Sequence, residues 1–208
     1  MKRSSRRCAS SSEPDPVCFS RILVTGVLAG LLAACVTQPP ALPPGEVPQV
    51  DRFELSGRVA VKLDGRGHSA RLRWRHLSDS DSIWLYSPVG STIATLHANG
   101  ELATLVTSKQ ETYQSTNVQL LTRDVLGWDL PLSGLKYWVL GRVDPEAPVE
   151  QIELDEQLRI RRLVQGGWDV EFASYQPDGT LPSAMVLRYE DLRLRLVVDR
   201  WNVASLEQ

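Results

Sequence analysis

From Phe53 onward, apolar and polar residues alternate with a period of two. Residues 53–63 place five apolar side chains on one side and polar or charged side chains on the other. Alternation of this kind is typical of an antiparallel strand with one buried face. The apolar positions are Phe53, Leu55, Val59, Val61 and Leu63.

A second strand is expected at 69–77, after the turn sequence Asp64–Gly67. Its apolar side carries Ala70, Leu72, Trp74 and His76, and the two strands form a predicted hairpin. Its other side carries a row of arginines, which fits either an anion-binding stripe or a solvated face. The alternation favours the solvated face. The arginines are Arg71, Arg73 and Arg75.

Nine further short segments continue the strand pattern, which gives eleven strands in total. In the third strand the pattern leaves the register open: either Ile83 and Leu85 or Trp84 and Tyr86 face inward. The clearest turn is 98–101, with Asn and Gly at its centre. The nine segments are 81–87, 92–98, 101–107, 111–115, 150–155, 158–165, 168–175, 183–189 and 192–200.

Between the sixth and seventh strands the apolar period lengthens to that of a helix. Residues 117–128 predict one short helix with Asn117 as its N-cap. Residues 131–141 predict a second, with Gly141 as its stop. A sheet of eleven twisted strands must curl or split, so we expect a curved antiparallel sheet whose trough is covered by this helix pair.

The N-terminal region has the pattern of a secretory signal. Ile22–Ala34 is a run of 13 uncharged residues that follows several basic ones. It is too short to be a convincing membrane-spanning helix, which needs about 20 residues. The run ends in Leu32-Ala33-Ala34-Cys35, which resembles the bacterial lipobox. We expect residues 1–34 to be removed and Cys35 to be lipidated; the alternative is a cysteine within an ordinary secretory signal.

Residues 35–52 are expected to form an extended linker between the lipid and the domain. Five prolines fall between Val36 and Asp51, with no periodic apolar pattern. In Gram-negative bacteria an aspartate directly after the lipidated cysteine typically marks retention in the inner membrane. Val36 stands there instead, so the outer membrane is expected. A domain at 53–203 and a short tail at 204–208 complete the organisation.

Composition and motifs argue against several function classes. After residue 34 the chain holds 18 Lys and Arg against 23 Asp and Glu, a net charge of −5, and no basic and aromatic stripe indicates nucleic acid. No nucleophile elbow, phosphate loop or cofactor fingerprint is present, so no catalytic residue and no cofactor is expected. The histidines are not at metal-ligand spacing, so no metal is expected. They are His68, His76 and His97.

Scattered carboxylates leave an envelope hydrolase as the least favoured alternative, since a glycosidase pair needs only two of them. The apolar inventory is more informative. Six tryptophans occur, several on inward faces of the expected strands and helices. Core packing is the simpler interpretation for each, and a ligand cavity is the other.

Three segments and the lipobox together resemble the LolB family of outer-membrane lipoproteins. The segments are "SPVGST" at 87–92, "DLPLSGLKYWVLG" at 129–141 and "LPSAMVLRYEDLRLRLVVDRWNV" at 181–203. The resemblance covers nearly all of residues 53–203 in the right order. It implies a mainly β, half-open antiparallel barrel of about 11 strands, with short helices lidding an apolar cavity.

The resemblance also implies a function. Members of the family accept acylated lipoproteins from a periplasmic LolA-type carrier and insert them into the outer membrane, without bond-breaking chemistry. An exposed apolar loop residue, usually leucine, is implicated in delivery to the inner leaflet, and Val89 between Pro88 and Gly90 matches it. We expect a monomer that binds no nucleic acid. The runner-up function is a structural or assembly lipoprotein that binds other envelope proteins.

Inward-facing apolar residues are the candidates for contact with acyl chains. They come from the expected hairpin, the helix pair and the last three strands. The candidates are Leu72, Trp74, Val125, Trp128, Tyr137, Trp138, Phe172, Met185, Leu187, Leu194 and Leu196.

Overall fold

The computed structural model describes residue 50 and residues 52–203. The chain divides into two compact units, Met1–Pro43 and Pro44–Gln208, and all the described residues belong to the second. The predicted signal, Cys35, nearly all of the linker and the 204–208 tail lie outside the described residues. Within the described part, no helix is long and apolar enough to cross a membrane.

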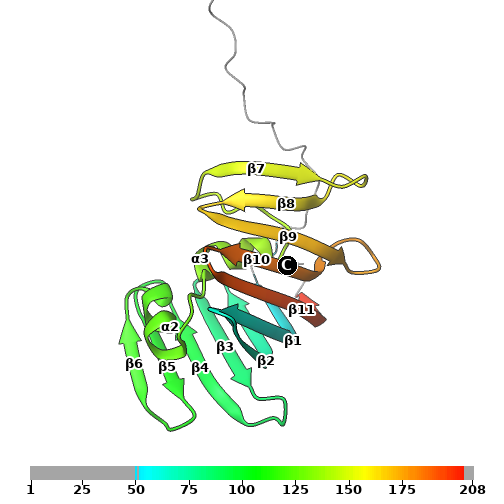
Figure 1. Ribbon diagram of the computed structural model, residues 1–208. Coiled ribbons are helices and arrows are strands. Elements are labelled where there is room, and N and C mark those ends of the chain that lie inside the picture. The colour runs from blue at the N-terminus through cyan, green and yellow to red at the C-terminus, as the bar shows by residue number, and fades with distance from the viewer. Residues whose placement is uncertain (1–49, 51, 204–208) are drawn as a thin grey trace, which may run out of the picture. The chain divides into compact units, whose positions relative to one another are not determined.

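A single 11-stranded antiparallel sheet dominates the unit (Figure 1). The strand order is β6-β5-β4-β3-β2-β1-β11-β10-β9-β8-β7, so β1 lies at the centre and the sheet stays open between β6 and β7. The strands are β1 (Arg52–Leu63), β2 (Arg66–Leu77), β3 (Ser80–Tyr86), β4 (Thr92–Ala98), β5 (Ala103–Thr107), β6 (Thr112–Ser115), β7 (Val149–Leu154), β8 (Ile160–Gln165), β9 (Trp168–Tyr175), β10 (Pro182–Tyr189) and β11 (Leu192–Val203).

Two short helices connect β6 to β7 and pack on the inner face of the sheet (Figure 1). Helix α2 (Val118–Leu126) begins at Asn117, whose side chain accepts a hydrogen bond from the Leu120 N–H as predicted. Helix α3 (Leu132–Trp138) ends three residues before Gly141. The prediction that Gly141 stops this helix was therefore wrong in position, because a turn with Gly141 at φ 72° follows the helix.

The eleven predicted strands are all present, and only their ends differ. The strand predicted at 101–107 begins at Ala103, because the Asn99 side chain accepts a hydrogen bond from the Leu102 N–H and extends the turn. The strand predicted at 158–165 begins at Ile160, because Leu158 lies in a turn at φ 62°. In β3 the open register is decided: Ile83 and Leu85 are buried.

The core lies between the inner face of the sheet and the two helices. Its largest fully buried side chain is Trp74, whose indole N–H donates to Asp81 Oδ1 at 2.7 Å. The same carboxylate oxygen accepts from Nδ1 of His76 at 2.8 Å. Asp81 and His76 face each other on the neighbouring strands β3 and β2, so this histidine takes part in a cross-strand pair.

A bulge interrupts the pairing of the two central strands, β1 and β11, between Ser56 and Gly57. It brings the β11 backbone very close to Gly57. A methyl group on Gly57 would stand 2.1 Å from the carbonyl oxygen of Val197. Only glycine fits this position without moving a strand.

We therefore expect Gly57→Ala to destabilise the fold by ~3 kcal/mol, as an overpacked core position does. Gly67→Ala is the matched control, since it also lies in a sheet strand and its new methyl group would have no neighbour within 4 Å. Urea unfolding followed by tryptophan fluorescence measures both. Equal stability of the two variants would show that the close approach at Gly57 does not constrain the sheet.

Candidate functional site

A small apolar cavity lies between α2 and strands β3, β4 and β5. Its volume is about 30 Å³, close to one water molecule's share of liquid water. Ligand pockets usually measure 300–1,000 Å³, so a bound chain requires the cavity to widen. The lining residues are Ile83, Leu85, Ala94, Leu96, Leu105, Thr122, Leu126, Trp128 and Leu130.

A second, open pocket of about 460 Å³ lies beside the tip of the β1–β2 hairpin. Two of its residues, Leu126 and Trp128, also line the small cavity, so they form the wall between the two spaces. Moving that wall would join the enclosed apolar space to the surface. The remaining residues of the open pocket are Val61, Leu63, Asp64, Arg66, His68 and Gly127.

Apolar contact attaches α2 to the sheet beneath it. Thr122, which is fully buried, donates to the carbonyl of Gln119 at 3.1 Å and accepts from the Leu130 N–H at 3.0 Å. Arg123 pairs with Asp129 just after the helix. Among the described residues, no α2 side chain makes a hydrogen bond to a strand, so a movement of α2 away from the sheet breaks no such bond.

Helix α3 is attached differently, through the fully buried side chain of Gln165 on β8. Gln165 Oε1 accepts from the Trp138 indole N–H and from the Asp144 N–H, both at 2.9 Å. Its Nε2 donates to the carbonyls of Asp144 and Ala147 at 2.8 and 2.9 Å. This network fixes the end of α3 and the segment that follows it to the sheet.

The structure divides the predicted acyl-chain candidates into two groups. Val125, Trp128 and Tyr137, all at or near the helices, are half-buried, and of all the candidates only Trp128 lines the small cavity. The other candidates are buried in the core without lining that cavity: Leu72, Trp74, Trp138, Phe172, Met185, Leu187, Leu194 and Leu196.

The cavity-lining residues that were not among the candidates lie on α2, on β3, β4 and β5, and between the two helices. Leu96 and Leu105 face each other across the β4–β5 pair, and both strands were predicted. Their inward position was therefore readable from alternation on either side of the Asn99–Gly100 turn. The inward position of Leu130 could not be predicted from alternation, because it depends on the path of the chain between the helices.

The loop between β3 and β4 presents Val89 to solvent, with 90% of its surface exposed. The Ser87 carbonyl accepts from the Gly90 N–H at 2.9 Å. The Ser87 N–H donates to the Ser91 carbonyl at 2.7 Å, and the Ser91 N–H donates to the Ser87 hydroxyl at 3.1 Å. Gly90 has φ 94°, a conformation that favours glycine. The loop is thus a tight turn that holds an apolar side chain away from the core, between Pro88 and Gly90, which are both exposed as well.

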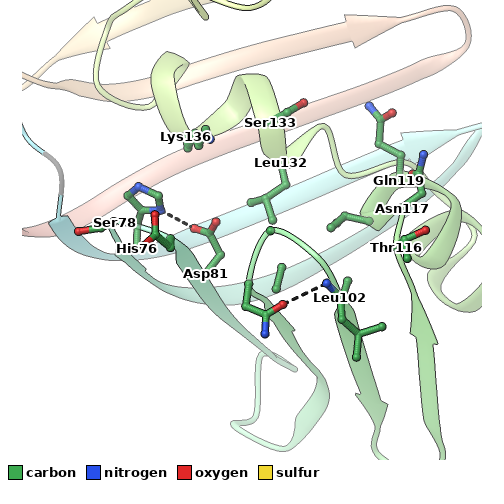
Figure 2. Close-up of a pocket in the computed structure, with 16 residues that line it drawn as sticks. His76, Ser78, Asp81, Leu102, Thr116, Asn117, Gln119, Leu132, Ser133 and Lys136 are labelled. Atoms are coloured by element: carbon green, nitrogen blue, oxygen red, sulfur yellow. Dashed lines mark hydrogen bonds and ion pairs between the residues drawn. The ribbon is translucent and has the colours of Figure 1, made fainter.

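A third pocket, of about 600 Å³, lies at the opposite end of the sheet from Val89 and is lined mostly by polar groups. Figure 2 shows His76 and Asp81 on its wall, with Lys136 and Ser133 of α3 and the start of α2 around it. The Asp81 carboxylate is occupied by Trp74 and His76. In the described part of the chain, no cluster of three His, Cys, Asp or Glu residues could hold a metal ion.

A family model for the outer membrane lipoprotein LolB matches residues 51–201, which include both helices and nearly the whole sheet. The chain belongs to the LolB family. The resemblance noted in the sequence is thereby confirmed, and so is the mainly β fold with an open 11-stranded antiparallel sheet and two short helices.

Named LolB relatives match over most of their length. The outer-membrane lipoprotein LolB of Nitrosomonas europaea is 37% identical over 154 residues, 72% of each chain. That of Thiobacillus denitrificans is 35% identical over 187 residues, 88% of this chain and 98% of the relative. A solved LolA superfamily protein from N. europaea has 7% identity and a TM-score of 0.43 over 76% of this chain and 88% of its own, a likeness that adds nothing to the LolB assignment.

We expect Gln165→Leu to destabilise the fold by about 3 kcal/mol, because the Trp138 indole N–H and the Asp144 N–H would lose their buried acceptor. Gln151 is exposed on the edge strand β7, and its amide bonds only the Glu153 carboxylate, so Gln151→Leu should change stability by less than about 0.5 kcal/mol. Urea unfolding of both variants tests this. A Gln165→Leu variant as stable as Gln151→Leu would contradict the anchoring role.

Proposed function

We propose that this LolB-family chain accepts lipoproteins from a LolA-type periplasmic carrier and inserts them into the outer membrane. The acyl chains enter the apolar space between α2 and strands β3 to β5. One observation carries this proposal: α2 covers an apolar cavity through contacts that contain no hydrogen bond from its side chains to the described strands. The outer-membrane lipoprotein relatives support the location.

Transfer of this kind needs no bond breaking, only a higher affinity for the same acyl chains at each step. Each buried CH2 contributes ~0.8 kcal/mol, so a modest difference in how well two cavities pack sets the direction of transfer. Lifting α2 exposes apolar surface to water, and an arriving acyl chain replaces the lost contacts. Both the free and the loaded states thus keep the inner face of the sheet covered.

Two further parts complete the proposed cycle. Lipidation of Cys35 would tether the chain, since several acyl chains together give a durable anchor where one gives only a marginal one. The exposed Val89 would enter the inner leaflet of the outer membrane and guide the released lipoprotein. Valine is shorter than the leucine usual in the family, so each contact would be weaker.

The transfer reaction tests the proposal directly. The mature chain without its lipidated cysteine, residues 36–208, is mixed with a LolA-type carrier that holds a radiolabelled lipoprotein, in the absence of ATP. We expect the label to move to this chain. If no label moves to a well-folded chain, the acceptor function is wrong and a structural or assembly lipoprotein becomes the better account.

Substitutions at Val89 separate uptake from delivery. Val89→Asp should take up the label normally and fail to release it into liposomes, because a charged side chain does not enter the bilayer. Val89→Leu is the matched control and should release at least as well as the unchanged chain. Normal release by Val89→Asp would exclude the loop from delivery.

Filling the cavity under α2 tests the acyl-chain site. Ala94 is buried in the cavity wall, so Ala94→Leu should reduce lipoprotein uptake at least tenfold while the chain stays folded. Ala60→Leu, on the outer face of β1, adds the same atoms outside the cavity and should leave uptake unchanged. The transfer assay with both variants decides this, and equal uptake would place the acyl chains elsewhere.

A further inference from the structure

The outer face of the four central strands is strongly basic. We call the cations on this face of β2, β1, β11 and β10 the basic face. From β2 and β1 it includes Arg71, Arg73, Arg75, Arg52, Arg58 and Lys62. From β11 and β10 it includes Arg193, Arg195, Arg200 and Arg188.

Only two carboxylates, Glu54 and Asp199, lie on the same face of these four strands. Asp199 pairs with Arg58 at 2.8 Å. Glu54 is shared by Arg73 and Arg75, at 2.7 and 3.1 Å. Burial raises the pKa of the Glu54 carboxyl, but hydrogen bonds from the two arginines outweigh it and keep the pKa below its ordinary value. Both carboxylates are therefore already neutralised.

The remaining cations of the basic face stand close to one another. Lys62 lies directly opposite Arg193 across the central strand pair. Arg193 in turn lies directly opposite Arg188, which pairs with Glu171 of β9 at 2.8 Å. Like charges at such positions destabilise a sheet. Lys62, Arg71, Arg193 and Arg195 are exposed, and none has an ion pair with another described residue.

This concentration of charge is not a general property of the chain, because the part after residue 34 carries a net charge of −5. The row Arg71, Arg73 and Arg75 on β2 alone indicated a solvated face. Strand pairing changes that interpretation, since it extends the row across β1, β11 and β10, which come from both ends of the domain. An anionic surface is the partner that such a face fits.

The position of the basic face favours a membrane. Strand β1 runs from the linker at Arg52 to the end of the sheet that carries the β3–β4 loop with Val89, because Arg58 pairs with Arg71 and Arg71 pairs with Tyr86 at the loop's base. With 12 residues, β1 spans ~40 Å.

We infer that the basic face binds anionic phospholipid headgroups, so that the domain lies along the membrane between its lipid anchor and Val89. The inference rests on the proposed function, which places both of those contacts on one bilayer. In the lying orientation, Lys62, Arg193 and Arg195 reach the headgroups, and their mutual repulsion is relieved by phosphate charge. The helices on the other face of the sheet remain free to receive a lipoprotein.

Vesicle flotation of the mature chain 36–208, which carries no lipid, tests this without a carrier or a lipoprotein. We expect binding to phosphatidylethanolamine vesicles that contain about a quarter phosphatidylglycerol, weak binding without it, and loss of binding at high salt. The triple variant Lys62→Gln, Arg193→Gln, Arg195→Gln should lower the partition coefficient about 100-fold at low salt.

A charge-matched control is available on exposed positions at the β5–β6 edge. The variant Ser108→Glu, Thr112→Glu, Gln114→Glu changes the net charge by the same amount and should bind nearly as well as the unchanged chain.

Equal losses of vesicle binding in the two variants would assign binding to net charge and overturn the inference. It is also wrong if the triple Gln variant floats normally and instead loses cross-linking to the carrier, since the basic face would then dock an acidic protein. If the chain floats as expected but takes up no label, the acceptor function is wrong while this inference stands.

Discussion

The structure depends on covering one wide apolar surface. An open sheet of eleven strands presents an inner face rich in Leu, Val, Trp and Phe, and exposing such a face costs ~25 cal/mol for each Å² of apolar area. A closed barrel or a second sheet would bury it permanently. Here two short helices do so, and they are attached by different means. Gln165 holds α3 by a satisfied polar network, whereas α2 is held to the strands by packing.

That difference gives the two helices different mechanical roles. Separating α3 from β8 would leave the N–H groups of Trp138 and Asp144 without an acceptor in an apolar interior, so α3 and β8 move together. Separating α2 from the strands breaks no side-chain hydrogen bond to them in the described part of the chain, and another apolar group can take its place. An acyl chain has the required chemistry. The proposed acceptor function thus rests on the absence of hydrogen bonds from α2 side chains to the described strands. The basic face and Val89 on the exterior are proposed to orient the domain toward a membrane.

Local pattern was enough to predict most of the fold. Alternation located all eleven strands, and the Asn117 cap and helical spacing located both helices, because these features depend on neighbours in sequence. The bulge at Gly57, the buried network of Gln165 and the cross-strand meeting of Lys62 with Arg193 depend on residues far apart in the chain. The lining of the small cavity also depends on residues far apart in the chain: it comes from α2, from the segment after it and from β3 to β5, whereas five of the eleven candidate acyl-chain residues lie on β9 to β11.

The position of a bound acyl chain tests the central claim most directly. A lipoprotein whose acyl chains carry a photoreactive group is transferred to this chain, irradiated, and the cross-linked residues are identified by mass spectrometry. The account predicts cross-links to residues between α2 and the inner face of β3, β4 and β5, such as Leu96, Leu105 and Leu126. Cross-links confined to the polar pocket around Lys136, or to the outer face of the sheet, would contradict it.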